Sequence, residues 1–160
     1  MVRIQNLILR VIKSMDIIAL LQGISILLLA LLFGSMVFFS FAMAPLIFIK
    51  LDIEVAGPFV RAVFPWYYLL IITLGAISCL LLVNFAPLNS GLMALVTASA
   101  IYCRQMLMPS INDYSDRSKA GERGVSKIFD RLHKRSEVMN GLQLLAVFAV
   151  LVHLAFTHFS

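Results

Sequence analysis

The chain has 160 residues, of which 61% are hydrophobic and 13% are charged, and its formal net charge is +5. A soluble domain contains about 25% charged residues, so this composition excludes an ordinary water-soluble protein. Charged residues are absent from residues 17–49 and again from residues 62–103. A bilayer core of about 30 Å needs about 20 apolar residues per helical crossing, so these two runs, with a third at residues 138–160, predict an all-α integral membrane protein.

The beginning of the chain has the pattern of an amphipathic helix. Between residues 2 and 15, apolar residues recur at helical spacing while basic and amide side chains occupy another face. This pattern predicts an interfacial helix that lies in the plane of the membrane. The apolar run that follows is too long for one upright crossing, and Pro45 favours a kink or a stop, so the first transmembrane helix is predicted at residues 20–42.

The second and third crossings are predicted to form an antiparallel hairpin. Residues 48–61 contain Gly57-Pro58 and are expected to be an interfacial connection. The sequence Phe-Pro-Trp-Tyr-Tyr then places a proline and three large rings at the depth of the lipid headgroups, so the second span is predicted at residues 66–83. A short, uncharged connector rich in turn formers leads to the third span at residues 91–108.

One polar segment interrupts the apolar pattern, at residues 109–135. It is expected to be a polar loop broken at Gly121 and Gly124, with a helix that begins near Val125 and continues into the fourth span at residues 138–158. The whole chain, residues 1–160, is therefore predicted to be a single four-span membrane domain.

The orientation follows from an uneven distribution of Lys and Arg. Four crossings place both termini on one side, together with three basic residues, whereas ten lie on the other side. The positive-inside rule then puts the polar loop in the cytoplasm and the termini outside. The basic flank of the first span, which often dominates insertion, favours the opposite orientation.

The basic net charge indicates contact with lipid headgroups, because most of the Lys and Arg residues flank the apolar runs. The lipid bilayer is therefore the expected partner, and no nucleic-acid partner is expected. A homo-oligomer or another membrane protein is a further possible partner.

The most distinctive polar pattern is a stripe that enters the fourth span from the loop. At 100° per residue its members share one face of a helix: Phe129, His133, Ser136, Asn140 and Gln143. Polar groups are costly in lipid without partners, so the stripe should face other helices or a wet cavity. One interpretation is a site for a small polar molecule, an ion or a proton, with His133 as the titratable group. The alternative is hydrogen bonding between helices that fixes their register.

Arg104 is the second candidate, because it lies just inside the membrane at the end of the third span. It could bind a lipid phosphate or an anionic substrate, or pair with Asp113 or Asp130. Extension of its guanidinium to water is the competing explanation. Asn112 follows on the same side, and Arg61 reaches that side by topology. The candidate ligand-binding residues are Arg104, Asn112, His133, Ser136 and Asn140.

Catalytic and metal-binding motifs are absent from the sequence. The two cysteines have no CxxC spacing, no HExxH or phosphate-binding glycine loop occurs, and the eight methionines are better explained as packing residues than as metal ligands. We predict no catalytic residue, no metal site and no cofactor. Three pairs have the small-xxx-small spacing that allows helices to approach closely: Ala30 and Gly34, Gly75 and Cys79, and Ala94 and Ala98.

Short motifs follow one another along nearly the whole chain: Gly34, Phe38, Ala44-Pro45, Phe48, Phe64-Pro65, Tyr67-Tyr68, Phe129, Leu132-His133, Ser136 and Asn140. In these motifs and their order the chain resembles the membrane family of unknown function that contains transmembrane protein 205. The resemblance implies a four-span integral membrane protein, and it supplies no reaction and no catalytic residue. The polar segment before the fourth span is shorter here than in the animal members.

The leading expectation for function is a non-enzymatic membrane protein of the bacterial inner membrane that binds or passes a small polar solute, an ion or a lipid headgroup. One alternative is a haem- or quinone-linked membrane oxidoreductase, against which the sequence lacks two histidines on facing spans. Another alternative is a structural or accessory subunit of a membrane complex, for which close-packing faces and interfacial aromatic residues would be sufficient.

Overall fold

Helices make up almost all of the computed structural model, which describes the backbone of residues 2–159 and the side chains of residues 15 and 17–157. Four stretches are long and apolar enough to cross a membrane: Ile17–Lys50, Ile53–Leu82, Pro87–Lys119 and Val125–Thr157. The prediction of an all-α integral membrane protein with four such helices is confirmed. The elements are α1 (Val2–Phe38), the π-helical turn η1 (Phe39–Met43), α2 (Ala44–Lys50), α3 (Ile53–Leu82), α4 (Pro87–Tyr102), the π-helical turn η2 (Cys103–Leu107), α5 (Met108–Lys119) and α6 (Val125–Phe159).

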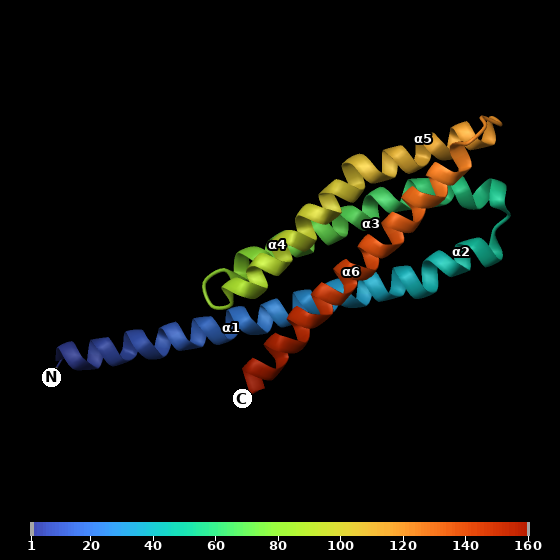
Figure 1. Ribbon diagram of the computed structural model, residues 1–160. Coiled ribbons are helices and arrows are strands. Elements are labelled where there is room, and N and C mark those ends of the chain that lie inside the picture. Colours follow the sequence, from blue (N-terminus) through green and yellow to red (C-terminus); the bar gives the residue numbers. More distant parts are fainter. Residues whose placement is uncertain (1, 160) are drawn as a thin grey trace.

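The elements form an elongated bundle with two distinct ends (Figure 1). The α3–α4 turn and both termini lie toward one end. The short connection at residues 51–52 and the turn at residues 120–124 lie at the other, which we call the loop end. Helices α3 and α4 form the antiparallel hairpin expected from the uncharged connector, and α6 crosses α1 and packs on it as well as on α4 and α5. This arrangement brings the polar segment and the connection after the first span to the same end.

Two of the prolines that lie inside helices, Pro45 and Pro109, each follow a π-helical turn. The N–H of Ala44 bonds to the carbonyl of Phe39, and the N–H of Met108 bonds to the carbonyl of Cys103, five residues back in both cases. A proline ring clashes with the carbonyl four residues before it, and a wider turn moves that carbonyl away. The helices therefore continue past Pro45 and Pro109 and do not stop there.

Two segments that we expected to be irregular are largely helical. Residues 48–61 were expected to be an interfacial connection, but only residues 51–52 are non-helical, and Pro58 lies in the second turn of α3. A proline so close to a helix start removes only one backbone hydrogen bond, which packing can offset. The polar loop expected at residues 109–135 is confined to residues 120–124, between α5 and α6.

The turn between α5 and α6 does depend on its two glycines. Gly121 and Gly124 have φ values of 82° and 83°, which side chains with a Cβ rarely adopt. The prediction that these residues break the segment, and that α6 begins near Val125, is confirmed.

The predicted N-terminal amphipathic helix is continuous with the first membrane helix, because α1 begins at Val2 and has no break before Phe38. The side chains of residues 2–14, which carry the predicted amphipathic face, lie outside the described residues. The span predicted at residues 20–42 lies within α1 and η1.

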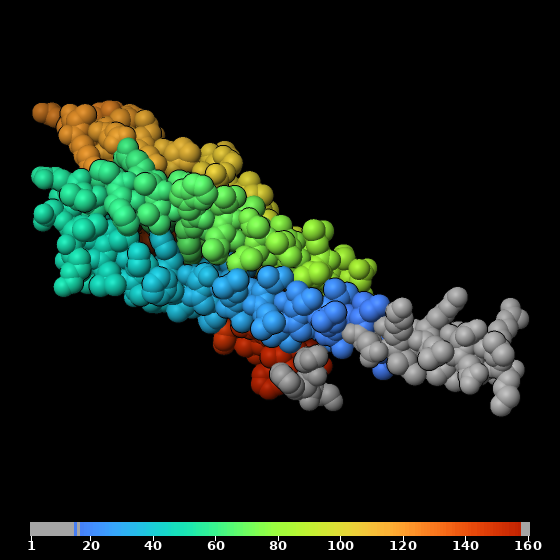
Figure 2. Space-filling view, turned by 180° about the vertical axis from the view of Figure 1, so that it is seen from behind, coloured from blue at the N-terminus to red at the C-terminus, as the bar shows by residue number. Residues whose placement is uncertain are grey.

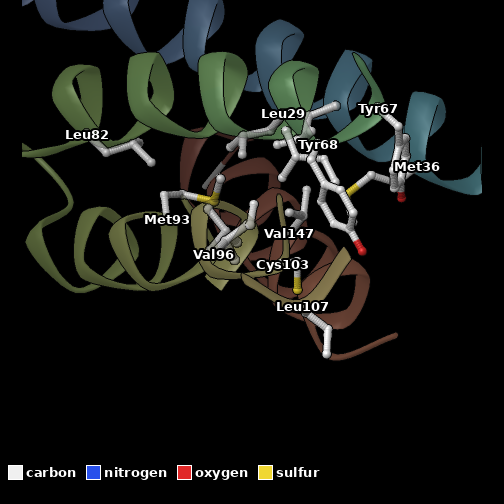
Figure 3. Close-up of a cluster of buried hydrophobic side chains, with 14 of the residues drawn as sticks. Leu29, Met36, Tyr67, Tyr68, Leu82, Met93, Val96, Cys103, Leu107 and Val147 are labelled. Carbon is white, nitrogen blue, oxygen red and sulfur yellow. The ribbon is translucent and has the colours of Figure 1, made fainter. Parts of the chain in front are cut away.

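A cluster of buried apolar side chains fills the interior between α1, α3, α4 and α6 (Figure 3). Its fully buried members include Leu29, Leu32, Met36, Ile71, Leu82, Met93 and Val147. Large apolar side chains on the outer faces are exposed, with Leu27 at 72%, Leu80 at 73% and Phe156 at 74%. Exposed apolar side chains on all helices are expected where lipid covers the surface.

Of the three small-xxx-small pairs, the structure uses one at a helix contact. Gly75 is buried against α4, and a Cβ added to it would lie 2.6 Å from Thr97 Oγ1. Cys79, one turn later, lies beside Ser90 with 3.4 Å between Sγ and Oγ. The other two pairs are exposed: Ala30 with Gly34, and Ala94 with Ala98. The spacing alone does not determine which face of a helix turns inward.

Candidate functional site

Two cavities lie side by side at the loop end, between α2, α3, α5 and α6. Figure 2 shows the surface hollowed between the segments of α2 and α3 near this end. One cavity, which we call the α5 lobe, has a volume of about 340 Å³, and the other, the α2 lobe, has a volume of about 450 Å³. The lobes share five lining residues and are treated together as the cleft: Phe48, Phe64, Tyr68, His133 and Ser136.

Four of the five predicted site residues line the cleft. His133 and Ser136 line both lobes, Asn112 lines the α5 lobe and Asn140 lines the α2 lobe. Arg104 lines neither lobe. Its Nε donates a hydrogen bond of 3.3 Å to the Pro65 carbonyl, and within the described residues it forms no ion pair, so the pairing considered with Asp113 or Asp130 is not present.

His133 lies at the mouth of the cleft, half exposed. Its Nε2 is 3.4 Å from a carboxylate oxygen of Glu137, and its ring stacks on Phe129 with 5.8 Å between the ring centres. The Ser136 hydroxyl donates to the His133 carbonyl at 2.7 Å, a bond within the helix that leaves the oxygen able to accept another. The imidazole is therefore held by neighbours on its own helix and faces both lobes.

Asn140 ties three helices together at the floor of the α2 lobe. Its Oδ1 accepts a hydrogen bond of 2.5 Å from the Tyr67 hydroxyl of α3, and its Nδ2 donates one of 2.8 Å to Ser40 in η1. Phe39 stacks on the Tyr67 ring with 4.2 Å between the ring centres. These contacts favour the explanation in which Asn140 fixes the relative positions of the helices.

Gln143, the last residue of the polar stripe, is separated from the cleft and is only 3% exposed. Its Nε2 donates to the Ser99 hydroxyl at 2.9 Å, while its Oε1 has no hydrogen-bond partner among the described residues. The stripe therefore has two parts. His133 and Ser136 face the cleft, whereas Gln143 bonds α6 to α4.

Arg61 connects α3 to α5 at the edge of the α5 lobe. Its guanidinium donates to both carboxylate oxygens of Asp116, at 2.9 and 2.8 Å, and to the Asn112 carbonyl at 3.4 Å. The prediction that Arg61 reaches the side of Asn112 is confirmed. The side chains of Ser40, Tyr67, Arg61 and Lys119 were not predicted as site residues, although the Tyr-Tyr pair and Arg61 were noted in the sequence.

Arg61 also affects the ionisation of Asp116, which lies in the polar part of α5 at the loop end, beyond the third span predicted at residues 91–108. The hydrogen bond from the guanidinium holds the pKa of this carboxyl below its usual value. The ion pair is therefore fully formed above the usual carboxyl pKa and is lost as the pH falls through the lowered value. Farther from the cleft, Arg117 similarly lowers the pKa of Glu122.

We expect Arg61→Gln to raise the pKa of Asp116 toward the ordinary value of about 3.9, because the variant removes the charged donor. The carboxyl carbon signal of Asp116, followed by NMR across a pH titration, measures this change. Arg117→Gln is the matched control, since Arg117 pairs with Asp113 and Glu122. An unchanged Asp116 titration in Arg61→Gln would show that the bridge does not form in solution.

Within the part of the chain that the structure describes, no group of three or more His, Cys, Asp or Glu residues is placed to hold a metal ion. The cleft is lined by a set of polar groups and by an apolar wall. That combination is typical of a site that holds a small molecule by shape and a few polar contacts.

Comparison with known proteins identifies a family without a known activity. No curated protein and no solved structure matches the chain, and nothing links it to transmembrane protein 205. A family model matches residues 27–120, which include Arg61 and Asn112 but not the α6 residues of the cleft. The chain belongs to the family described as "Domain of unknown function (DUF4149)".

Proposed function

We propose that this protein is a non-enzymatic membrane protein that binds a small molecule in the cleft at the loop end. The observation that carries the proposal is the junction of the two lobes at His133 and Ser136, residues that the polar pattern of α6 had already singled out. Polar lining groups that come from α3, α5 and α6 meet there around an apolar wall. A ligand of this site would have both polar and apolar parts.

The position of the cleft supports binding over passage through the bundle. The cleft lies at one end, whereas the interior toward the other end is filled by fully buried side chains such as Leu29, Leu82 and Met93. A solute that crossed the membrane between these helices would have to separate this packed cluster, and protein interiors resist such expansion.

Blocking the cleft tests this function. We expect Ser136→Phe to fill the junction of the two lobes and to lower the amount of bound small molecule at least tenfold, because Ser136 lines both lobes and donates only within its own helix. The measurement is mass spectrometry of small molecules extracted from the purified protein, expressed as molecules per chain.

Ser126→Phe provides a matched control, since Ser126 is exposed on the same helix and lines neither lobe. It should keep the wild-type amount of bound molecule. Circular dichroism and melting temperature establish that both variants fold. Equal recovery from the two folded variants would contradict a binding function for the cleft, and a stable protein partner that replaces the small molecule would favour the accessory-subunit alternative.

For location, we propose the bacterial inner membrane with both termini outside the cytoplasm. Basic side chains that include Arg61, Arg117 and Lys119 gather at the loop end, which supports a cytoplasmic position for that end. A relationship to the family of transmembrane protein 205 also remains a proposal, and it rests on the motifs quoted above.

A further inference from the structure

We infer that the α5 lobe binds the phosphate group of a membrane phospholipid, with Lys119 as the cationic partner, Arg61 as a further hydrogen-bond donor and the apolar wall in contact with the adjoining acyl chains. This inference rests on the proposed binding function and specifies its ligand. It is carried by three features of the lobe: its charge, its free polar groups and its apolar wall.

The charge of the lining favours an anion. Arg61, Lys119 and His133 line the α5 lobe, and none of its lining residues is Asp or Glu. Asp116 neutralises Arg61 from outside the lobe. Lys119, in contrast, forms no direct ion pair or hydrogen bond among the described residues, although Asp116 feels its charge at a distance. Its Nζ would lie 3.6 Å from a Cβ added to Gly57. The lobe therefore has an ammonium group that is not in direct contact with a carboxylate.

Uncommitted polar side chains lie beside this ammonium group. Asn112, Ser115 and Ser118 line the same lobe from α5, and their side chains make no hydrogen bond within the described part of the chain. An amide and two hydroxyls are donors that phosphate oxygens accept. The hydrogen bond from Arg61 to the Asn112 carbonyl is long, at 3.4 Å, so this guanidinium N–H is also able to turn toward a phosphate oxygen.

Most of the remaining lining residues are apolar, and a free ion would make no favourable contact with them. The apolar ones include Phe48, Ile53, Phe64, Met108, Ile111 and Phe129. Covering such side chains with hydrocarbon is favourable in proportion to the area removed from water. The lobe lies at the loop end, where the charge-free run of α3 adjoins Arg61 and where α5 carries charged residues from Asp113 onward, which is the depth of lipid headgroups. A phospholipid satisfies both requirements, and inorganic phosphate satisfies only one.

The test compares a phospholipid with the diacylglycerol that lacks its phosphoglycerol headgroup. Delipidated protein in a neutral detergent is titrated with phosphatidylglycerol and with diacylglycerol of the same chains, and bound lipid is counted by native mass spectrometry. We expect phosphatidylglycerol to bind at least tenfold more tightly, and its affinity to fall as NaCl is raised. Millimolar inorganic phosphate should not displace it.

Lys119 variants connect the result to the α5 lobe. A cation near an anionic lipid contributes enough that Lys119→Gln should weaken phosphatidylglycerol binding about fivefold and leave diacylglycerol binding unchanged. Lys119→Arg should keep the affinity, and Lys119→Glu should lower it further. Lys134→Gln is the control, because Lys134 is exposed on α6 and lines neither lobe.

Each contrary result has a distinct meaning. Equal affinity for the two lipids, or no effect of Lys119→Gln, would overturn the assignment of the phosphate group. If Ser136→Phe still removed the bound small molecule, the cleft would remain supported as a binding site. Displacement by millimolar inorganic phosphate would overturn the lipid in favour of a free anion. No binding of either lipid, together with equal small-molecule recovery from Ser136→Phe and Ser126→Phe, would remove the proposed function itself.

Discussion

Asn140→Ala should lower the free energy of unfolding by about 1–3 kcal/mol, because it removes the hydrogen bonds that Asn140 makes to two other helices. Asn140 accepts from Tyr67 on α3 and donates to Ser40 in η1. The measurement is reversible unfolding in mixed micelles with increasing dodecyl sulfate. Because both bonds are at the floor of the α2 lobe, the variant should also loosen the cleft and weaken ligand binding.

A double-mutant cycle separates the Tyr67–Asn140 bond from other effects of the substitution. The coupling between Tyr67→Phe and Asn140→Ala should be about 0.6–1.7 kcal/mol, the range of hydrogen bonds between membrane helices. Ser136→Ala is a suitable control, since that hydroxyl donates only to its own helix. A coupling of zero would indicate that Asn140 bonds to water or to a ligand instead of to Tyr67.

Gly75→Ala should also destabilise the bundle, by about 1–3 kcal/mol, because α3 and α4 are too close to accommodate a methyl group there. The added Cβ would lie 2.6 Å from Thr97 Oγ1, well inside van der Waals contact. Thr97 cannot yield freely, because its hydroxyl donates to the Met93 carbonyl at 2.8 Å. The same unfolding measurement in mixed micelles gives the size of the effect.

Thr97→Ala should restore most of the stability lost in Gly75→Ala, since the next nearest Thr97 atom, its Cβ, is at the ordinary contact distance of 3.8 Å. Gly34→Ala is the matched control, because a Cβ there would meet nothing within 4 Å. Alanine is the better helix former, so this control should be neutral or slightly stabilising. Equal losses from Gly75→Ala and Gly34→Ala would contradict close packing at Gly75.

The polar stripe of α6 shows how one sequence pattern can serve two purposes. Helical spacing correctly indicated that His133, Ser136, Asn140 and Gln143 face other parts of the protein. The structure divides the stripe between the lining of the cleft and contacts with other helices. His133 and Ser136 face an open cleft, whereas Asn140 and Gln143 bond to other helices. The two pairs of residues differ in how deep they lie in the bundle, and helical periodicity does not indicate depth.

Arg104 shows that a position on the same side of the membrane as a site does not make a residue part of that site. It lies on the same side as the cleft, yet its guanidinium contacts the Pro65 carbonyl, while Arg61 and Lys119 line the α5 lobe. Arg104 belongs to η2, where the turn is wider than in an α-helix. A π-helical turn shifts the direction of every side chain on it relative to the regular helical pattern, so regular periodicity misplaces residues there.

The sequence by itself determined the four apolar helices, their hairpin order, the glycine turn before Val125 and the end of the bundle at which polar groups gather. These features depend on the length of apolar runs and on local backbone preferences, both of which are properties of the linear sequence. Only the tertiary structure decided that Asn140 joins Tyr67 to Ser40, that Arg61 pairs with Asp116, and that Gly75 is the small residue at a helix contact. Those outcomes depend on how each helix is rotated and where its π-helical turn lies, and both result from packing among all the helices together.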